Sequence, residues 1–182
     1  MPIVWTDKPE ANHLLDTDPL ALLIGMVLDQ QVKMEKAFSG PYDLKVRLGH
    51  LDVRKIADMD PDRLDAVFRE RPALHRFPGS MAKRVQALCQ AIVKDYHGDA
   101  GAVWREARDG DDLAARIKKL PGFGEMKVKI LVAVLAKKFN VKPKGWEKHA
   151  ANWHTVADVD SPESMAEARQ VKREMKAGKK SS

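Results

Sequence analysis

The stretch KKLPGFGEMKVKILVAVLAKKF, from Lys118 to Phe139, contains a Pro-Gly-x-Gly turn between two runs with helical patterning. Gly122 and Gly124 supply the backbone freedom that a reversal between two helices requires, and we expect the second helix to begin at about Glu125. Backbone amides exposed at a helix start can bind a phosphate oxygen, and carbonyls of the same turn can hold a bridging monovalent cation. The stretch therefore predicts a phosphate-binding turn; the alternative is an ordinary tight turn between packed helices.

Positive charge gathers directly after this turn. The chain has a net charge of +6, and residues 126–150 hold seven lysines against one acid, which is also +6. Such stripes attract polyanions, because each lysine near a phosphate releases a condensed counterion. A second basic cluster, RQVKREMKAGKK, begins at Arg169. We expect a helix there that passes into a flexible basic tail at about residues 176–182, for which a solvated lysine face is the simpler interpretation.

Composition excludes several classes of protein. The 182 residues, 44% of them hydrophobic, are enough for one compact domain over residues 1–182. Cys89 is the only cysteine, which excludes a disulfide framework and a cysteine-held zinc or iron–sulfur centre within the chain. The start, MPIVWTDKPEANHLLD, lacks a secretion signal, and no uncharged run approaches the roughly 20 residues that cross a bilayer. We expect no metal other than the turn's monovalent cation, no cofactor and no membrane contact, in a cytoplasmic protein that is nucleoid-associated if bacterial.

The hydrophobic periodicity predicts an all-α fold without strands. A long, mostly buried helix is expected from Pro19, capped by one of the preceding residues, to about Phe38, where SGPYD breaks it. Further helices are expected over residues 42–48, 53–58, 61–69, 80–96, 102–107, 111–119 and 125–139, and from residue 162 onward. The basic stretch after Phe139 is expected to be irregular.

Three segments resemble the helix-hairpin-helix (HhH-GPD) superfamily of base-excision DNA glycosylases, which includes endonuclease III. They are DPLALLIGMVLDQQ, FPGSMAKRVQALCQAI and LPGFGEMKVKILVAVL, and the resemblance covers roughly Pro19 to Phe139. The resemblance implies two helical lobes around a DNA-binding cleft, without the iron–sulfur cluster, and a helix-hairpin-helix motif at about residues 111–139. The implied partner is double-stranded DNA with a damaged or mispaired base that is flipped into the cleft.

The resemblance also implies a set of DNA-binding residues. A glutamine at the end of the superfamily's opening helix often fills the gap left by the flipped base, and Gln31 matches it, with Gln30 adjacent; a polar helix end is the alternative. Trp146 is the best aromatic candidate for stacking, although such residues often seal the seam between lobes. The complete predicted set is Gln30, Gln31, Leu120, Gly122, Phe123, Gly124, Lys127, Lys129 and Trp146.

The catalytic positions of the superfamily are not matched directly. Met126 stands where bifunctional members have a Schiff-base lysine, with Lys127 next to it on the apolar arc of the predicted helix, whereas Met126 points toward the polar side. Lys127 is a candidate nucleophile if burial disfavours its ammonium form; the alternative is a stem on apolar surface with its head at solvent or phosphate.

The superfamily's catalytic aspartate is replaced by Lys144 at the expected distance from Gly124. A carboxylate is needed because departure of the base leaves positive charge on the sugar. The candidates are Glu147, Asp158 and Asp29. Asp158 has an alternative role as a helix cap, and Glu147 as the partner of a neighbouring lysine.

These observations predict a DNA N-glycosylase of base excision repair that hydrolyses the glycosidic bond of a damaged or mispaired base, monofunctional rather than a lyase. The main alternative is a non-catalytic helix-hairpin-helix DNA-binding or repair-accessory protein, because the catalytic lysine and aspartate are not matched. A third alternative is a helical protein-interaction domain with solubilising lysines.

Overall fold

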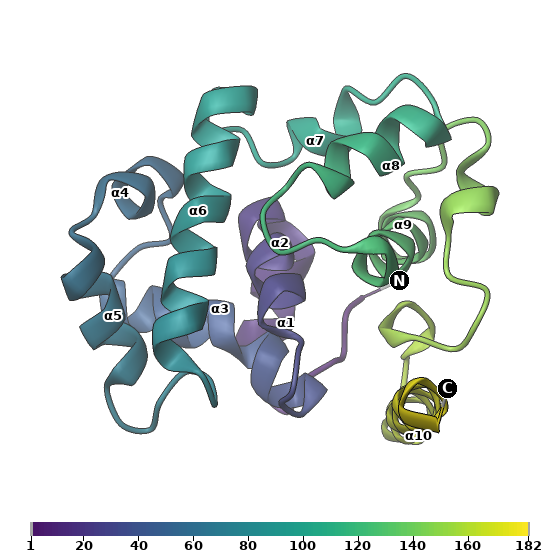
Figure 1. The fold of residues 1–182 in the computed structure, drawn as a ribbon, viewed down its shortest axis with the longest axis horizontal. Helices are drawn as coiled ribbons and strands as arrows, with labels where there is room; N and C mark the ends of the chain where they lie inside the picture. The colour runs from purple at the N-terminus through teal and green to yellow at the C-terminus, as the bar shows by residue number, and fades with distance from the viewer. Residues whose placement is uncertain (1, 182) are drawn as a thin grey trace.

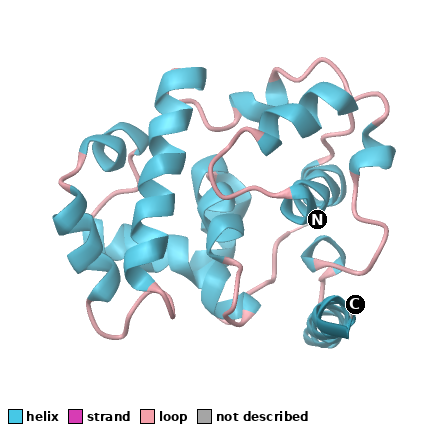
Figure 2. Ribbon diagram, in the orientation of Figure 1, coloured by secondary structure: helices cyan, strands magenta, loops and turns pink. Residues whose placement is uncertain are grey.

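The computed structural model describes residues 2–181, with side chains up to residue 178, and this part of the chain contains helices and no strand (Figure 2). The all-α prediction is confirmed. The elements are α1 (Pro9–Thr17), α2 (Pro19–Leu28), α3 (Met34–Leu48), α4 (Val53–Asp58), α5 (Pro61–Arg69), α6 (Pro78–Tyr96), α7 (Ala102–Arg105), α8 (Gly110–Lys118), α9 (Glu125–Phe139), the 3₁₀ helices η1 (Trp146–His149) and η2 (Val156–Asp158), and α10 (Pro162–Ser181).

Helix α2 lies between two groups of helices. The helices α4, α5 and α6 lie on one side of it, and α8, α9 and the C-terminal segment lie on the other (Figure 1). Every residue of α2 after Pro19 is buried. A helix that is apolar all round is stable only in a protein interior, which explains its central place. Asp18 caps it by accepting from the amide of Leu20, and Pro19 occupies the first turn.

The prediction of one long helix from Pro19 to Phe38 was wrong, because the chain breaks earlier than expected. Helix α2 ends at Leu28, a loop with Gln31 at φ 56° follows, and α3 then runs through Ser39 and Pro41. Close packing keeps this second segment helical despite the missing amide of Pro41. A Cβ at Gly40 would lie 2.4 Å from Cδ1 of Leu28, so the backbone of α3 lies directly against α2.

The boundaries of other elements also differ from prediction. Helix α1 was not predicted, α6 begins two residues before Ser80, and α8 begins with Asp109 as its cap. The region after Phe139 contains the two 3₁₀ helices. Of the predicted flexible tail at residues 176–182, residues 176–181 are helical as the end of α10, and residue 182 lies outside the described residues. Within the described residues, no helix combines the length and apolar character that crossing a bilayer would require.

Candidate active site and DNA interface

The turn between α8 and α9 contains two glycines with different roles. The fold requires a glycine at one position, whereas the other position has free space around it. Gly122 has φ 89°, and a Cβ there would lie 3.2 Å from Cγ2 of Val27. Gly124 has φ −86°, a Cβ there would meet no atom within 4 Å, and no side chain caps the start of α9. The amides at this helix start are therefore open to an anion. The side chains of Leu120 and Phe123, predicted to bind DNA, are buried and anchor the turn from inside.

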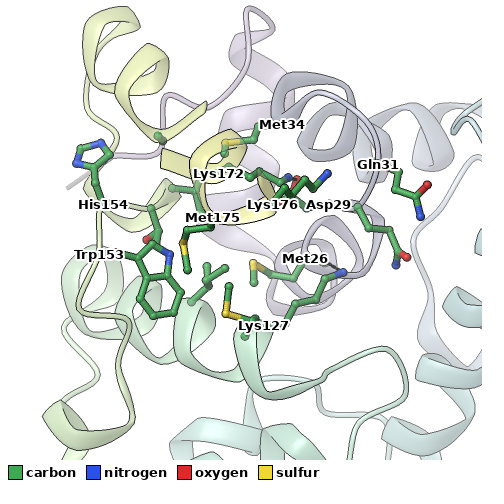
Figure 3. A pocket seen from close by; sticks show the side chains of 16 residues that line it. Met26, Asp29, Gln31, Met34, Lys127, Trp153, His154, Lys172, Met175 and Lys176 are labelled. Atoms are coloured by element: carbon green, nitrogen blue, oxygen red, sulfur yellow. Dashed lines mark hydrogen bonds and ion pairs between the residues drawn. The ribbon is translucent and has the colours of Figure 1, made fainter. Parts of the chain in front are cut away.

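A cavity of about 330 Å³ lies beside this turn (Figure 3). It is enclosed by the end of α2 and the loop after it, the start of α9, the segment around η2, and α10. Its walls are mostly apolar, with four methionines and one tryptophan. The lining residues are Met26, Asp29, Gln30, Gln31, Met34, Met126, Lys127, Ile130, Trp153, His154, Thr155, Val156, Ala168, Lys172, Met175 and Lys176.

Lys127 extends from α9 to the last turn of α2. Its Nζ donates to the carbonyl oxygens of Met26, at 2.7 Å, and Val27, at 3.0 Å. The pKa of Lys127 is lowered to about 8, chiefly by burial; the charge of Asp29 opposes this shift, and the nearby charge of Lys172 adds to it. The direction of this shift favours the neutral amine that a nucleophile requires, but the two hydrogen bonds direct Nζ to the backbone of α2. Met126 lines the same cavity, so the prediction that it faces the polar side was wrong.

Asp29 is the carboxylate that the structure brings to Lys127. It follows the last residue of α2, its side chain is 10% exposed, and its Oδ1 accepts from Nζ of Lys172 at 2.8 Å. Among the described residues, Asp29 is the only acid that lines the cavity. A carboxylate and two lysine ammonium groups therefore meet inside an apolar enclosure (Figure 3).

The other predicted site residues lie outside the cavity. Glu147 is exposed on η1. Asp158 forms a capping box with Thr155 and an ion pair with Lys137, so it has a structural role. Trp146 packs on the hydrophobic core, and Trp153 lines the cavity in its place.

The two glutamines after α2 differ in how firmly their side chains are held. Gln30 is held on both sides of its amide: its Oε1 accepts from Nη1 of Arg84 at 2.7 Å, and its Nε2 donates to the carbonyl of Val27 at 3.1 Å. Gln31 is exposed and has a left-handed backbone conformation. Of the two, Gln31 is the side chain free to enter a DNA duplex.

His75 holds this glutamine loop and was missed from the sequence. Its Nδ1 accepts from the amide of Phe77, so its Nε2 carries the proton and donates to the carbonyl oxygens of Leu28, at 3.0 Å, and Gln30, at 3.1 Å. Burial lowers the pKa of His75, a direction that favours the neutral imidazole. Phe77, which is 39% exposed, is joined to the loop through this imidazole. The exposed aromatic in the Pro-Gly loop RFPGS was the available signal.

Helix α10, which was predicted as a final amphipathic helix with a basic tail from about residue 176, supplies a wall of the cavity. Lys172, Met175 and Lys176 all line it. The helix is tied down by an ion pair between Arg169 and Glu35, and by the buried side chain of Ala168. The amphipathic spacing of α10 was visible in the sequence, but the surface that it covers was not.

Comparison with known proteins identifies the family. The chain matches the family model described as HhH-GPD superfamily base excision DNA repair protein over residues 24–179. It therefore belongs to that superfamily, whose members bind DNA in base excision repair and typically include DNA glycosylases. Searches of curated proteins and of solved structures each returned no significant match. No group of three or more metal-binding side chains occurs in the part of the chain that the structure describes.

Proposed function

We propose that this protein is a monofunctional DNA glycosylase that hydrolyses the N-glycosidic bond of a damaged or mispaired base flipped into the cavity. The observation that carries the proposal is the placement of Asp29 and Lys127 in one largely apolar cavity beside the open turn at Gly124. A concave apolar site with a few convergent polar groups and a lysine of perturbed pKa is typical of an active site.

DNA binding is assigned to the rim of this cavity. A phosphate binds at the open amides near Gly124, and the exposed Lys129 adds charge along the backbone. Gln31 enters the space that the flipped base leaves, and the exposed ring of Phe77 stacks on the neighbouring bases. The carbonyls of the turn can hold a monovalent cation that bridges to the phosphate.

The chemistry is assigned to Asp29. When the bond between C1′ and the base nitrogen breaks, its electron pair leaves with the base and positive charge develops on the sugar. A carboxylate in a desolvated cavity stabilises that charge. Water then adds its oxygen to C1′, and one water proton ends on the departed base.

Lys127 supports monofunctional rather than lyase chemistry. With a pKa of about 8 it is mainly an ammonium ion at neutral pH, and its protons are directed to two carbonyl oxygens. An amine in that state is a poor nucleophile toward C1′. A lysine–sugar adduct is therefore not expected.

A non-catalytic DNA-binding protein is the second candidate. The observation in its favour is that Asp29 and Lys127 are both engaged by other groups of the chain, in the ion pair with Lys172 and the bonds to α2. In this case the open turn and the lysines serve recognition alone.

Release of free base from a panel of lesion-containing duplexes separates the two candidates. The wild-type protein should release at least one base, and Asp29→Asn should reduce the rate by at least about a hundredfold while leaving duplex affinity nearly unchanged. Glu147→Gln, the same kind of change at an exposed acid outside the cavity, is the matched control. No release from any lesion, with salt-dependent DNA binding intact, would establish the non-catalytic alternative.

Borohydride treatment during turnover addresses the lyase question. We expect base release without a trapped covalent protein–DNA adduct. A trapped adduct that is lost in Lys127→Met would contradict the monofunctional assignment.

A further inference from the structure

The charged side chains that line the cavity do not balance. Lys127, Lys172 and Lys176 face Asp29, which leaves three positive charges minus one negative, or +2, with His154 counted as neutral. Outside the lining, the one acid that pairs with a lining side chain among the described residues other than those above is Glu167, which lies 3.8 Å from Nε2 of His154 and is 70% exposed to solvent. Arg84, which bonds to Gln30 at the rim, adds a further positive charge near Lys127.

The free hydrogen-bonding capacity of the cavity is also one-sided. An ammonium group has three protons; Lys127 directs its Nζ to two carbonyl oxygens and Lys172 to one carboxylate oxygen, so both retain donor capacity. On the acceptor side, both amide atoms of Gln30 are already bonded, and Oγ1 of Thr155 accepts from the amide of Ala157. Oδ2 of Asp29 and the side-chain amide of Gln31 remain as acceptors. Among the described lining residues, a bound base therefore meets three positively charged donor groups and one carboxylate.

From this imbalance we propose, on the basis of the glycosylase function above, that the cavity selects neutral bases that carry carbonyl oxygens and rejects cationic N-methylated purines. Uracil, hypoxanthine and 8-oxoguanine represent the accepted class. Their carbonyl oxygens accept from the lysine protons, whereas a methylated purine such as N7-methylguanine brings a formal positive charge into a positive enclosure.

The same charges suit the departure of a neutral base. A neutral base leaves with the bonding electron pair and becomes an anion until it gains a proton, so nearby ammonium groups stabilise the developing negative charge. A cationic base leaves as a neutral molecule and gains nothing from them. Binding and bond cleavage thus favour the same class of base.

The tryptophan in the cavity wall favours cationic bases, but the net positive charge of the lysines has the larger effect. Trp153 presents an aromatic ring to the cavity, and such a ring attracts cations weakly. One aromatic face acts against a net of two full charges in a partly desolvated space, where charge–charge interactions are the stronger of the two. The ring also stacks on neutral bases, so it does not restore a preference for cations.

The binding test uses two purines of similar size in otherwise identical duplexes, hypoxanthine and N7-methylguanine. Each is placed on a 2′-fluoro sugar. The fluorine destabilises the positive charge that develops on the sugar during cleavage, so the bond stays intact and binding alone is measured. The 182-residue protein should bind the hypoxanthine duplex at least about tenfold tighter than the N7-methylguanine duplex, each affinity being taken relative to the duplex without a lesion.

Two charge reversals on α10 serve as variant and control. Lys176→Glu changes a lining residue and should reduce the ratio of the two affinities, hypoxanthine over N7-methylguanine, by about tenfold. Arg173→Glu makes the same change in charge at an exposed residue of the same helix outside the lining, and should leave the preference unchanged. Equal or tighter binding of N7-methylguanine, or a preference that both variants change alike, would overturn the inference.

Cleavage distinguishes this inference from the function on which it rests. On ordinary deoxyribose, corrected for spontaneous loss, the neutral oxo bases should be released faster than N7-methylguanine. Faster release of N7-methylguanine would overturn the charge selection and leave the glycosylase assignment intact. Release of no base at all would overturn the glycosylase assignment, and the binding preference would still decide the charge selection.

Discussion

Lys172 and Asp29 form an ion pair in the cavity, with Nζ 2.8 Å from Oδ1, although they are 143 positions apart in the chain. The side chains are 29% and 10% exposed, respectively. The pair joins the C-terminal helix to the end of the central helix, so it completes the cavity and holds its single acid in place.

Loss of Lys172 should destabilise the protein, because it leaves the Asp29 carboxylate in the cavity without its partner. Lys172→Met should lower the free energy of unfolding by about 1–3 kcal/mol, and Lys172→Arg should retain most of it. Arg173→Met, at an exposed residue of the same helix outside the cavity lining, is the control and should change it by less than about 0.5 kcal/mol. Urea unfolding measures all three, and equal effects of the two methionine substitutions would contradict the role of the pair.

The stability of the protein should rise with pH in a way that depends on Lys127. Its pKa is about 8 in the folded protein against 10.5 for an ordinary lysine, so the unfolded chain binds more protons between these values. The free energy of unfolding is therefore lowered by this burial at and below pH 8, and it rises as the pH increases from about 8 toward 10.5. Relative to Lys127→Met, the wild type should gain about 2 kcal/mol of unfolding free energy between pH 7 and pH 10.

The difference between the two denaturation curves isolates this contribution from other groups that titrate at high pH. A difference that stays flat from pH 7 to pH 10 would mean that Lys127 is not buried as the structure places it.

The two glycines of the turn should respond differently to alanine. Gly122→Ala places a Cβ at φ 89° close to Val27, and should lower the free energy of unfolding by about 1–2 kcal/mol. Gly124→Ala should leave stability within about 0.5 kcal/mol, because no atom lies within 4 Å of the new methyl group. That methyl group occupies the space where the phosphate approaches, so duplex affinity should fall by about tenfold. Unchanged affinity in Gly124→Ala would place the phosphate elsewhere.

Gln31→Gly should separate stability from DNA binding. Gln31 has φ 56°, which glycine adopts without steric cost, so the variant should gain about 0.5–1 kcal/mol of unfolding free energy. The same variant should bind a duplex containing an abasic-site analogue less tightly, because no side chain fills the gap. Gln30→Ala should instead lose stability, since it removes the bonds to Arg84 and Val27. Affinity that is unaffected in Gln31→Gly would exclude it as the gap-filling residue.

The all-α class and the helix-hairpin-helix motif were predictable because their signals are local. The apolar run of α2, the Pro-Gly-x-Gly turn and the apolar periodicity of α9 act within a few turns of helix. The exact end of α2 was not predictable, because Asp29 to Lys33 became a loop through contacts with distant residues. His75, which lies 45 or more residues away in the chain, donates a hydrogen bond to two carbonyl oxygens there.

The sequence by itself determined the motif and the concentration of lysines behind it, since glycine conformation, helix periodicity and charge are properties of short segments. Only the tertiary structure decided which acid accompanies Lys127. Asp29, directly after α2, and Lys172, on α10, meet because close packing brings the two helices to the start of α9. Glu147 and Asp158 are nearer to the turn in sequence, but they lie outside the cavity, because separation along the chain does not fix the direction of a side chain in the folded protein.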